Sequence, residues 1–213
     1  MRTLAALLVS SITTSKVMAA SLVINWSISD ERRLYDRNAR PLDAGTSAPG
    51  DGTLLQLGYY DRATTANPFL GSWIVLATTS MGDDGLETAG QFTASSILGA
   101  GSFPEPALGT PLAIRFYDGV TVESSSYYNA VSVTDGSWNF QNLSDPAPVL
   151  DLVIEKGPPT VFETGPLGDF MTRRAIPEPS TFLLAVTGAV AVGMRRKPSM
   201  NRRPPLSIRV TGP

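Results

Sequence analysis

The chain has 213 residues, of which 42% are hydrophobic, and it contains neither cysteine nor histidine. This length leaves room for one domain of roughly 150 residues, which buries about 70% of its unfolded surface. The missing cysteine excludes disulfides, thiolate zinc sites and cysteine nucleophiles. The missing histidine excludes imidazole metal ligands and Ser-His-Asp catalysis. We therefore expect neither a cofactor nor an enzymatic activity.

Charge is distributed unevenly along the chain. All nineteen acidic residues precede position 195, whereas residues 195–213 hold six basic residues and no acid. An acidic body repels phosphate backbones, so no nucleic-acid partner is expected.

The N-terminus, residues 1–20, is predicted to be a secretion signal peptide. Arg2 precedes a short apolar run, Leu4 to Val9, and small residues follow up to Ala19 and Ala20. This order is typical of a signal helix with cleavage at Ala19 or Ala20. The alternative is a buried first helix or strand.

Residues 21–156 are predicted to form one β domain. Apolar and polar residues alternate with period two from Leu22, and further short runs of this kind are separated by Gly, Asp and Pro turns. The predicted strands are Leu22 to Ser29, Leu54 to Tyr60, Trp73 to Thr78, Leu112 to Tyr117, Tyr127 to Thr134, Ser137 to Gln141 and Val149 to Glu155, with a weaker one near Gln91 to Ile97. Asp135-Gly136 is predicted to turn a tight hairpin. The fold class is all-β, an antiparallel β-sandwich or jelly roll, with the signal helix before it and a short membrane helix after it.

Three stretches lack a clear strand pattern. Residues 30–42 are charged and fit a short helix or a loop, and residues 85–101 fit a helix or an edge strand. Residues 157–175 are rich in Gly and Pro, so we interpret them as a linker.

The C-terminal region, residues 176–197, combines three features in a fixed order. Pro177-Glu178-Pro179 comes first, thirteen uncharged residues follow from Phe182 to Met194, and Arg195-Arg196-Lys197 closes the segment. A cationic cluster after an apolar run is what a membrane stop on the cytoplasmic side requires. Thirteen helical residues span only about 20 Å of a hydrocarbon core of roughly 30 Å, so length alone favours a buried helix.

This ordered set resembles the PEP-CTERM sorting domain of Gram-negative bacteria over about residues 176–197. The resemblance implies Sec export, transient anchoring in the inner membrane, and recognition by an exosortase, a membrane protease-transferase, with delivery to the cell envelope or extracellular space. Pro177, Glu178 and Pro179 would be the sorting motif, and Arg195, Arg196 and Lys197 the membrane stop. The basic tail, residues 198–213, is predicted to be disordered. A second tripeptide, Pro104-Glu105-Pro106, has no apolar segment after it.

For the β domain we expect a non-catalytic envelope or matrix protein. The alternative is a carbohydrate- or calcium-binding adhesion module with extracellular polysaccharide as a possible partner, and the third hypothesis is a carboxylate-dependent hydrolase. Candidate carboxylates are Asp83 and Asp84, which are weak metal candidates, and the group Asp30, Glu31 and Asp36. An outward row of aromatic rings would favour sugar binding. The aromatic candidates are Trp73, Trp138, Tyr59, Tyr60, Tyr127 and Tyr128.

Overall fold

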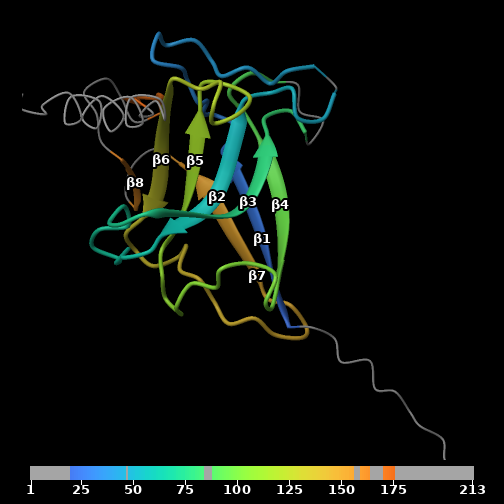
Figure 1. Cartoon of the computed structure of the whole chain (residues 1–213), viewed down its shortest axis with the longest axis vertical. Coiled ribbons are helices and arrows are strands. Elements are labelled where there is room, and N and C mark those ends of the chain that lie inside the picture. The colour runs from blue at the N-terminus through green and yellow to red at the C-terminus, as the bar shows by residue number, and fades with distance from the viewer. Residues whose placement is uncertain (1–19, 47, 84–87, 156–158, 164–169, 176–213) are drawn as a thin grey trace, which may run out of the picture. The chain divides into compact units, whose positions relative to one another are not determined.

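The computed structural model describes residues 20–46, 48–83, 88–155, 159–163 and 170–175 (Figure 1). The regular elements of this part of the chain are all β-strands, which confirms the all-β class. Among these residues no helix qualifies as a membrane span. The predicted signal helix, the apolar segment 182–194 and the basic tail lie outside the described residues.

The smaller sheet has three strands in the order β4-β1-β7. Their bounds are Ser21–Ile28 for β1, Thr93–Gly99 for β4 and Val149–Ile154 for β7. The predicted alternation is confirmed in β1, where Leu22, Ile24 and Trp26 are buried and the residues between them are partly exposed. β1 pairs antiparallel with β4 but parallel with β7. The expectation of a purely antiparallel sandwich is therefore wrong for this pair.

The larger sheet has six strands, in the order β3-β2-β5-β6 with β8 and β9 along the outer edge of β6. Their bounds are Leu54–Tyr60 for β2, Trp73–Ser80 for β3, Leu112–Tyr117 for β5, Tyr127–Val133 for β6, Thr160–Phe162 for β8 and Arg174–Ala175 for β9. All pairs in this sheet are antiparallel. Every residue of β2 is buried, so both faces of this strand are covered.

The two sheets share one hydrophobic core. Inward residues of both sheets, such as Ile24 in β1 and Leu57 in β2, belong to a single buried cluster. The ring of Trp26 packs edge-on against Phe92 at a centroid distance of 5.7 Å. The domain is therefore a two-layer β-sandwich, and its layers are visible in Figure 1.

One predicted strand is wrong. Residues 137–141 form no strand, and Asn139 makes only an isolated bridge with Pro111. Trp138 and Phe140 are nonetheless buried in the core. Asp135 accepts a hydrogen bond from the Ser137 amide at 2.9 Å, which closes a local turn rather than the predicted hairpin.

The three stretches without a clear strand pattern contain loops and short or edge strands. The region 30–42 is irregular, so the loop alternative holds, and the described part of 85–101 contains edge strand β4. Residues 157–175 differ from the expected linker, because β8 and β9 lie within this range and pair with β6.

Candidate functional site

The segment next to the predicted sorting motif, residues 170–175, is hydrogen-bonded to the domain. The Tyr35 amide donates to the Phe170 carbonyl at 2.7 Å, and the Thr172 amide donates back to the Tyr35 carbonyl at 2.9 Å. The Asn129 side-chain amide donates to the Met171 carbonyl at 2.9 Å. Thr172 is fully buried. The segment is therefore part of the fold up to the end of β9.

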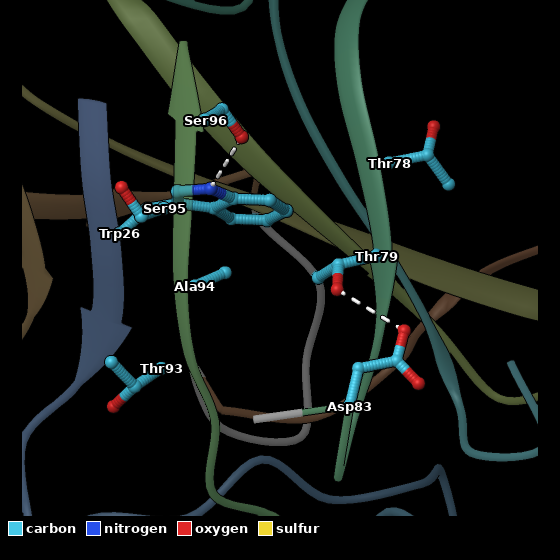
Figure 2. A pocket seen from close by; sticks show the side chains of 8 residues that line it. All are labelled: Trp26, Thr78, Thr79, Asp83, Thr93, Ala94, Ser95 and Ser96. Carbon is cyan, nitrogen blue, oxygen red and sulfur yellow. Dashed lines mark hydrogen bonds between the residues drawn. The ribbon is translucent and has the colours of Figure 1, made fainter. Parts of the chain in front are cut away.

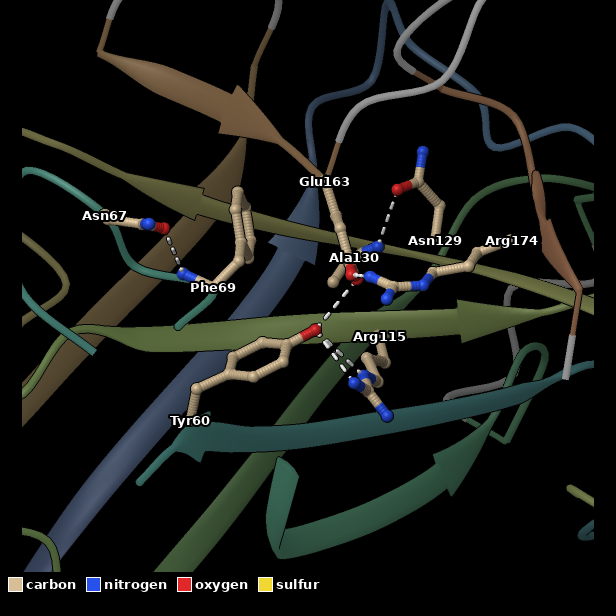
Figure 3. Close-up of polar contacts among 8 residues, drawn as sticks. All are labelled: Tyr60, Asn67, Phe69, Arg115, Asn129, Ala130, Glu163 and Arg174. Carbon is tan, nitrogen blue, oxygen red and sulfur yellow. Dashed lines mark hydrogen bonds and ion pairs between the residues drawn. The ribbon is translucent and has the colours of Figure 1, made fainter. Parts of the chain in front are cut away.

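A chain of charged contacts joins β9 to the central strands (Figure 3). Arg174 forms an ion pair with Glu163, whose side chain is only 10% exposed. Glu163 also accepts a hydrogen bond from the Tyr60 hydroxyl at 2.8 Å. The Tyr60 oxygen in turn accepts from Arg115 Nη2 at 2.8 Å and from Nε at 3.3 Å. The nearly buried carboxylate of Glu163 thus has two partners, which offsets part of its desolvation.

Arg115 is surrounded by aromatic rings on the outer face of the larger sheet. Its guanidinium carbon lies 4.4 Å from the Trp73 ring centroid, 4.6 Å from that of Tyr128 and 5.0 Å from that of Tyr60. These are cation–π distances. The cation therefore covers the rings that a sugar would need for stacking.

Gln56 and the two neighbouring tyrosines complete this outer layer. Gln56 Oε1 accepts hydrogen bonds from Trp73 Nε1 at 3.1 Å and from the Tyr117 hydroxyl at 2.7 Å. Burial raises the pKa of the Tyr117 phenol, and it raises the pKa of Tyr60 against the opposing effect of Arg115. Both phenols are therefore neutral hydrogen-bonding groups at neutral pH.

The other predicted aromatic residues lie elsewhere. Tyr59 and Trp138 belong to the core cluster. Tyr127 lies beneath Arg37, whose guanidinium carbon is 4.4 Å from the ring centroid. The aromatic candidates do not form one open row.

A cleft of about 260 Å³ lies between β3 and β4, the two strands that border one side of the sandwich (Figure 2). Trp26 lies at this cleft with 1% of its surface exposed and donates from Nε1 to Ser96 Oγ at 3.1 Å. Hydroxyl groups line most of the rest. They belong to Thr78, Thr79, Thr93, Ser95 and Ser96.

Among the described residues that line this cleft Asp83 is the ionisable one, and its carboxylate closes a turn. Oδ2 accepts from the Ser80 amide at 2.9 Å and from Thr79 Oγ1 at 3.3 Å, and Oδ1 accepts from the Gly50 amide at 2.8 Å. Asp84 lies outside the described residues. These bonds assign Asp83 a structural role.

Three other aspartates follow the same pattern. A second cleft of about 400 Å³ includes Asp36, Asp43 and Asp118, and each accepts a backbone N–H: Asp36 from Arg40, Asp43 from Gly45, and Asp118 from Ser126. Asp30 and Glu31 lie in an exposed turn. Among the described residues, no group of three or more His, Cys, Asp or Glu is placed to hold a metal ion.

The sequence-predicted sorting residues, Pro177, Glu178, Pro179, Arg195, Arg196 and Lys197, lie outside the described residues, as does Ala19. Comparison with known families finds a PEP-CTERM protein-sorting motif at residues 175–197. No curated protein and no solved structure matched the chain. The matched segment begins at Ala175, the last residue of β9.

Proposed function

We propose that this chain is an exported, non-catalytic protein of the cell envelope or extracellular matrix, delivered there by exosortase-dependent sorting. The observation that carries the proposal is the PEP-CTERM motif at residues 175–197. In this role Pro177, Glu178 and Pro179 are the recognition motif, Phe182 to Met194 enter the inner membrane, and Arg195, Arg196 and Lys197 hold the far end in the cytoplasm.

The position of β9 supports this division of the chain. Only Ile176 lies between Ala175 and Pro177, and two extended residue-to-residue steps reach at most about 7 Å. Processing within the Pro-Glu-Pro motif would leave every described strand in the mature protein. The β domain is therefore the part of the chain that is exported, and the segment after it is the sorting signal.

The non-catalytic part of the proposal rests on composition and on the carboxylates. The hydrolase hypothesis depends on carboxylate pairs, because the chain has no His or Cys, but the Asp residues in the two clefts described above accept backbone N–H bonds in turns. The covered rings around Arg115 give no support to a sugar-stacking platform.

The direct test is mass spectrometry of both termini after fractionation of the native host. We expect a mature chain that begins near Ala20 or Ser21 and ends near Pro177 to Pro179, in the envelope or extracellular fraction. An intact chain from Met1 to Pro213 in the cytosol would contradict the proposal.

The chain contains its own matched control for the motif. Glu178 and Glu105 each lie between two prolines, but Glu105 is in an exposed loop of the domain. We expect Glu178→Ala to leave an unprocessed chain in the membrane fraction and Glu105→Ala to be processed normally. An equal effect of both substitutions would mean that the C-terminal tripeptide is not what the exosortase recognises.

A further inference from the structure

The outer edge of β4 carries backbone groups without partners. The Ala100 amide donates to the Ala20 carbonyl at 2.9 Å, and the Ile28 amide donates to the Phe92 carbonyl at 3.2 Å. In an antiparallel pair, successive residues direct their backbone N–H and C=O groups alternately toward the partner strand and away from it. The even-numbered residues of β4 therefore bond to β1, whereas Ser95 and Ile97 direct these groups toward the outer edge. Within the described part of the chain these four groups have no hydrogen-bond partner.

This edge lacks the usual protection against strand pairing. β4 contains no charged residue and no proline, and its register with β1 runs without a bulge. The other outer strand of this sheet, β7, carries Asp151, and β3 is paired to β2 across an irregularity at Leu57/Gly58. Charges, prolines and bulges are the devices that keep exposed edges apart.

The face beside this edge is apolar along one row. Ile97 lies opposite Val23, and Val23 lies opposite Val149 on the other side. Ile97 is 74% exposed and Val149 is 57% exposed. The row therefore begins at the free edge with a large uncovered side chain.

We propose that β4 is the contact surface between two copies of this chain, paired antiparallel about a two-fold axis at Ser96. In this register Ser95 lies opposite Ile97 of the second copy and Ile97 lies opposite its Ser95. The four free groups on each side then satisfy one another, and the two smaller sheets become one six-stranded sheet. Ile97 of each copy packs beside Ser95 of the other on the outer face.

A second copy is the occupant that these features favour. A two-fold contact needs a strand that is complementary to itself. β4 meets this condition, because the outward N–H and C=O groups of Ser95 can bond to those of Ile97 in the second copy, and the reverse. The strand is uncharged although the body is acidic, so the pairing brings no carboxylate of β4 opposite another. The contact is small, and we therefore expect weak, reversible association.

The absence of cysteine allows a cross-linking test in the full chain. One tagged chain carries Ser95→Cys and a differently tagged chain carries Ile97→Cys; both are produced in the same cells, and the fraction that contains them is oxidised with copper phenanthroline. In the proposed register the two Cα atoms lie about 5.5 Å apart, within disulfide range, whereas identical residues are diagonal neighbours at about 7–8 Å. We expect several-fold more disulfide-linked dimer from the mixed pair than from either variant alone.

Val75→Cys is the matched control, because Val75 is exposed but lies on β3 in the other sheet. Its mixture with Ile97→Cys should give little dimer. Equal cross-linking of all the pairs would mean random collision and would overturn the proposal, as would the absence of any dimer. Neither outcome depends on whether the C-terminal motif is processed.

Amide hydrogen exchange on the unaltered chain tests the same contact without any substitution. Amide hydrogen exchange at Ser95 and Ile97 should slow several-fold between dilute and concentrated protein, while exchange in β3 should not change. Exchange at Ser95 and Ile97 that is independent of concentration would also overturn the proposal.

Discussion

The two sheets bury their residues in different ways. In β1 and β7 buried and more exposed residues alternate, whereas every residue of β2 is buried. The smaller sheet packs one face on the core and leaves the other in water, but the central strands of the larger sheet are covered on both faces. Alternating burial thus identifies a strand with one face in solvent. Continuous burial identifies a strand that is covered on both faces.

Polar and aromatic side chains cover the outer face of the larger sheet. Arg115, Tyr60 and Gln56 lie on its outer face and have partners for their hydrogen-bonding groups. On the smaller sheet the corresponding outward residues, such as Asn25, are partly exposed, and the hydrogen bond of Asn25 to Asp151 lies in solvent. Substitutions on the two outer faces should therefore differ in cost.

The largest expected effect compares the inner and outer faces of the smaller sheet. Ile24 is fully buried, so Ile24→Ala should lower the free energy of unfolding by about 2–5 kcal/mol. Ile97→Ala, at an exposed position, should change it by no more than about 0.5 kcal/mol in dilute protein. Urea denaturation of the full-length variants measures both, and similar losses would show that the assigned faces are wrong.

The second comparison sets the two outer faces against each other. Gln56→Ala leaves the buried Tyr117 hydroxyl without its acceptor, at about 1–3 kcal/mol, and adds a smaller cost at the part-buried Trp73 Nε1. Asn25→Ala removes an exposed hydrogen bond to Asp151 and should cost about 0.5 kcal/mol. Equal urea midpoints for the two variants would mean that water reaches the outer face of the larger sheet.

The third prediction concerns alkaline pH. Burial raises the folded-state pKa of Tyr60 and Tyr117 above the ordinary value of 10.0. The unfolded chain therefore releases these protons first, so stability is unaffected below pH 10 and falls as pH rises above it.

Tyr117→Phe should make the fall in unfolding free energy above pH 10 less steep, whatever it does to stability at neutral pH. Urea denaturation at a series of pH values, with tyrosinate absorbance as the titration signal, measures this slope. A slope identical to that of the unaltered chain would show that Tyr117 titrates equally in both states.

The smallest expected effect concerns the C-terminal edge of the larger sheet. Glu163→Gln removes the charge that pairs with the largely exposed Arg174, so the global loss should be no more than about 1 kcal/mol. Amide exchange of residues 170–175 should nevertheless accelerate, because the ion pair joins Arg174 of β9 to Glu163, the residue that follows β8. Asp61→Asn, which breaks an exposed pair with Arg62 at 3.9 Å, should change neither quantity. If exchange at 170–175 stays slow in Glu163→Gln, the backbone contacts alone hold this segment.

Period-two patterns predicted most strands well, because β1, β2, β3, β5, β6 and β7 combine alternating or continuous apolar residues with clear turns. The same rule failed at 137–141. Trp138 and Phe140 alternate with exposed or partly exposed neighbours there, but the segment packs into the core as a loop whose pairing with residues 110–112 is limited to one isolated bridge. Alternation indicates which residues are buried, and it indicates a strand only where backbone pairing with a neighbour continues over several residues.

β8 and β9 escaped prediction for the opposite reason. They have three and two residues, and they lie among Gly and Pro in a range interpreted as a linker. Their stability depends on β6, Tyr35 and Asn129, which are distant in the sequence. Segments this short form strands only where tertiary contacts hold them.

The candidate sites also differ in whether local sequence or tertiary contacts define them. The sorting motif is a linear order of residue types, so the sequence was sufficient to predict it and the family match confirmed it. The cluster around Arg115 has no sequence signature, because it brings together β2, β3, β5 and β6. Asp83 looked like a metal candidate, and its hydrogen bonds to Gly50 and Ser80 became visible only in the folded chain.

The sequence by itself thus determined the β class, most strand positions and the sorting motif, because each depends on residues close together in the chain. The tertiary structure decided the parallel pairing of β1 with β7, the cover over Arg115, the anchoring of residues 170–175 and the free edge of β4. Each of these depends on which distant segments meet, and that is set by the packing of the common core and the need of buried polar groups for partners.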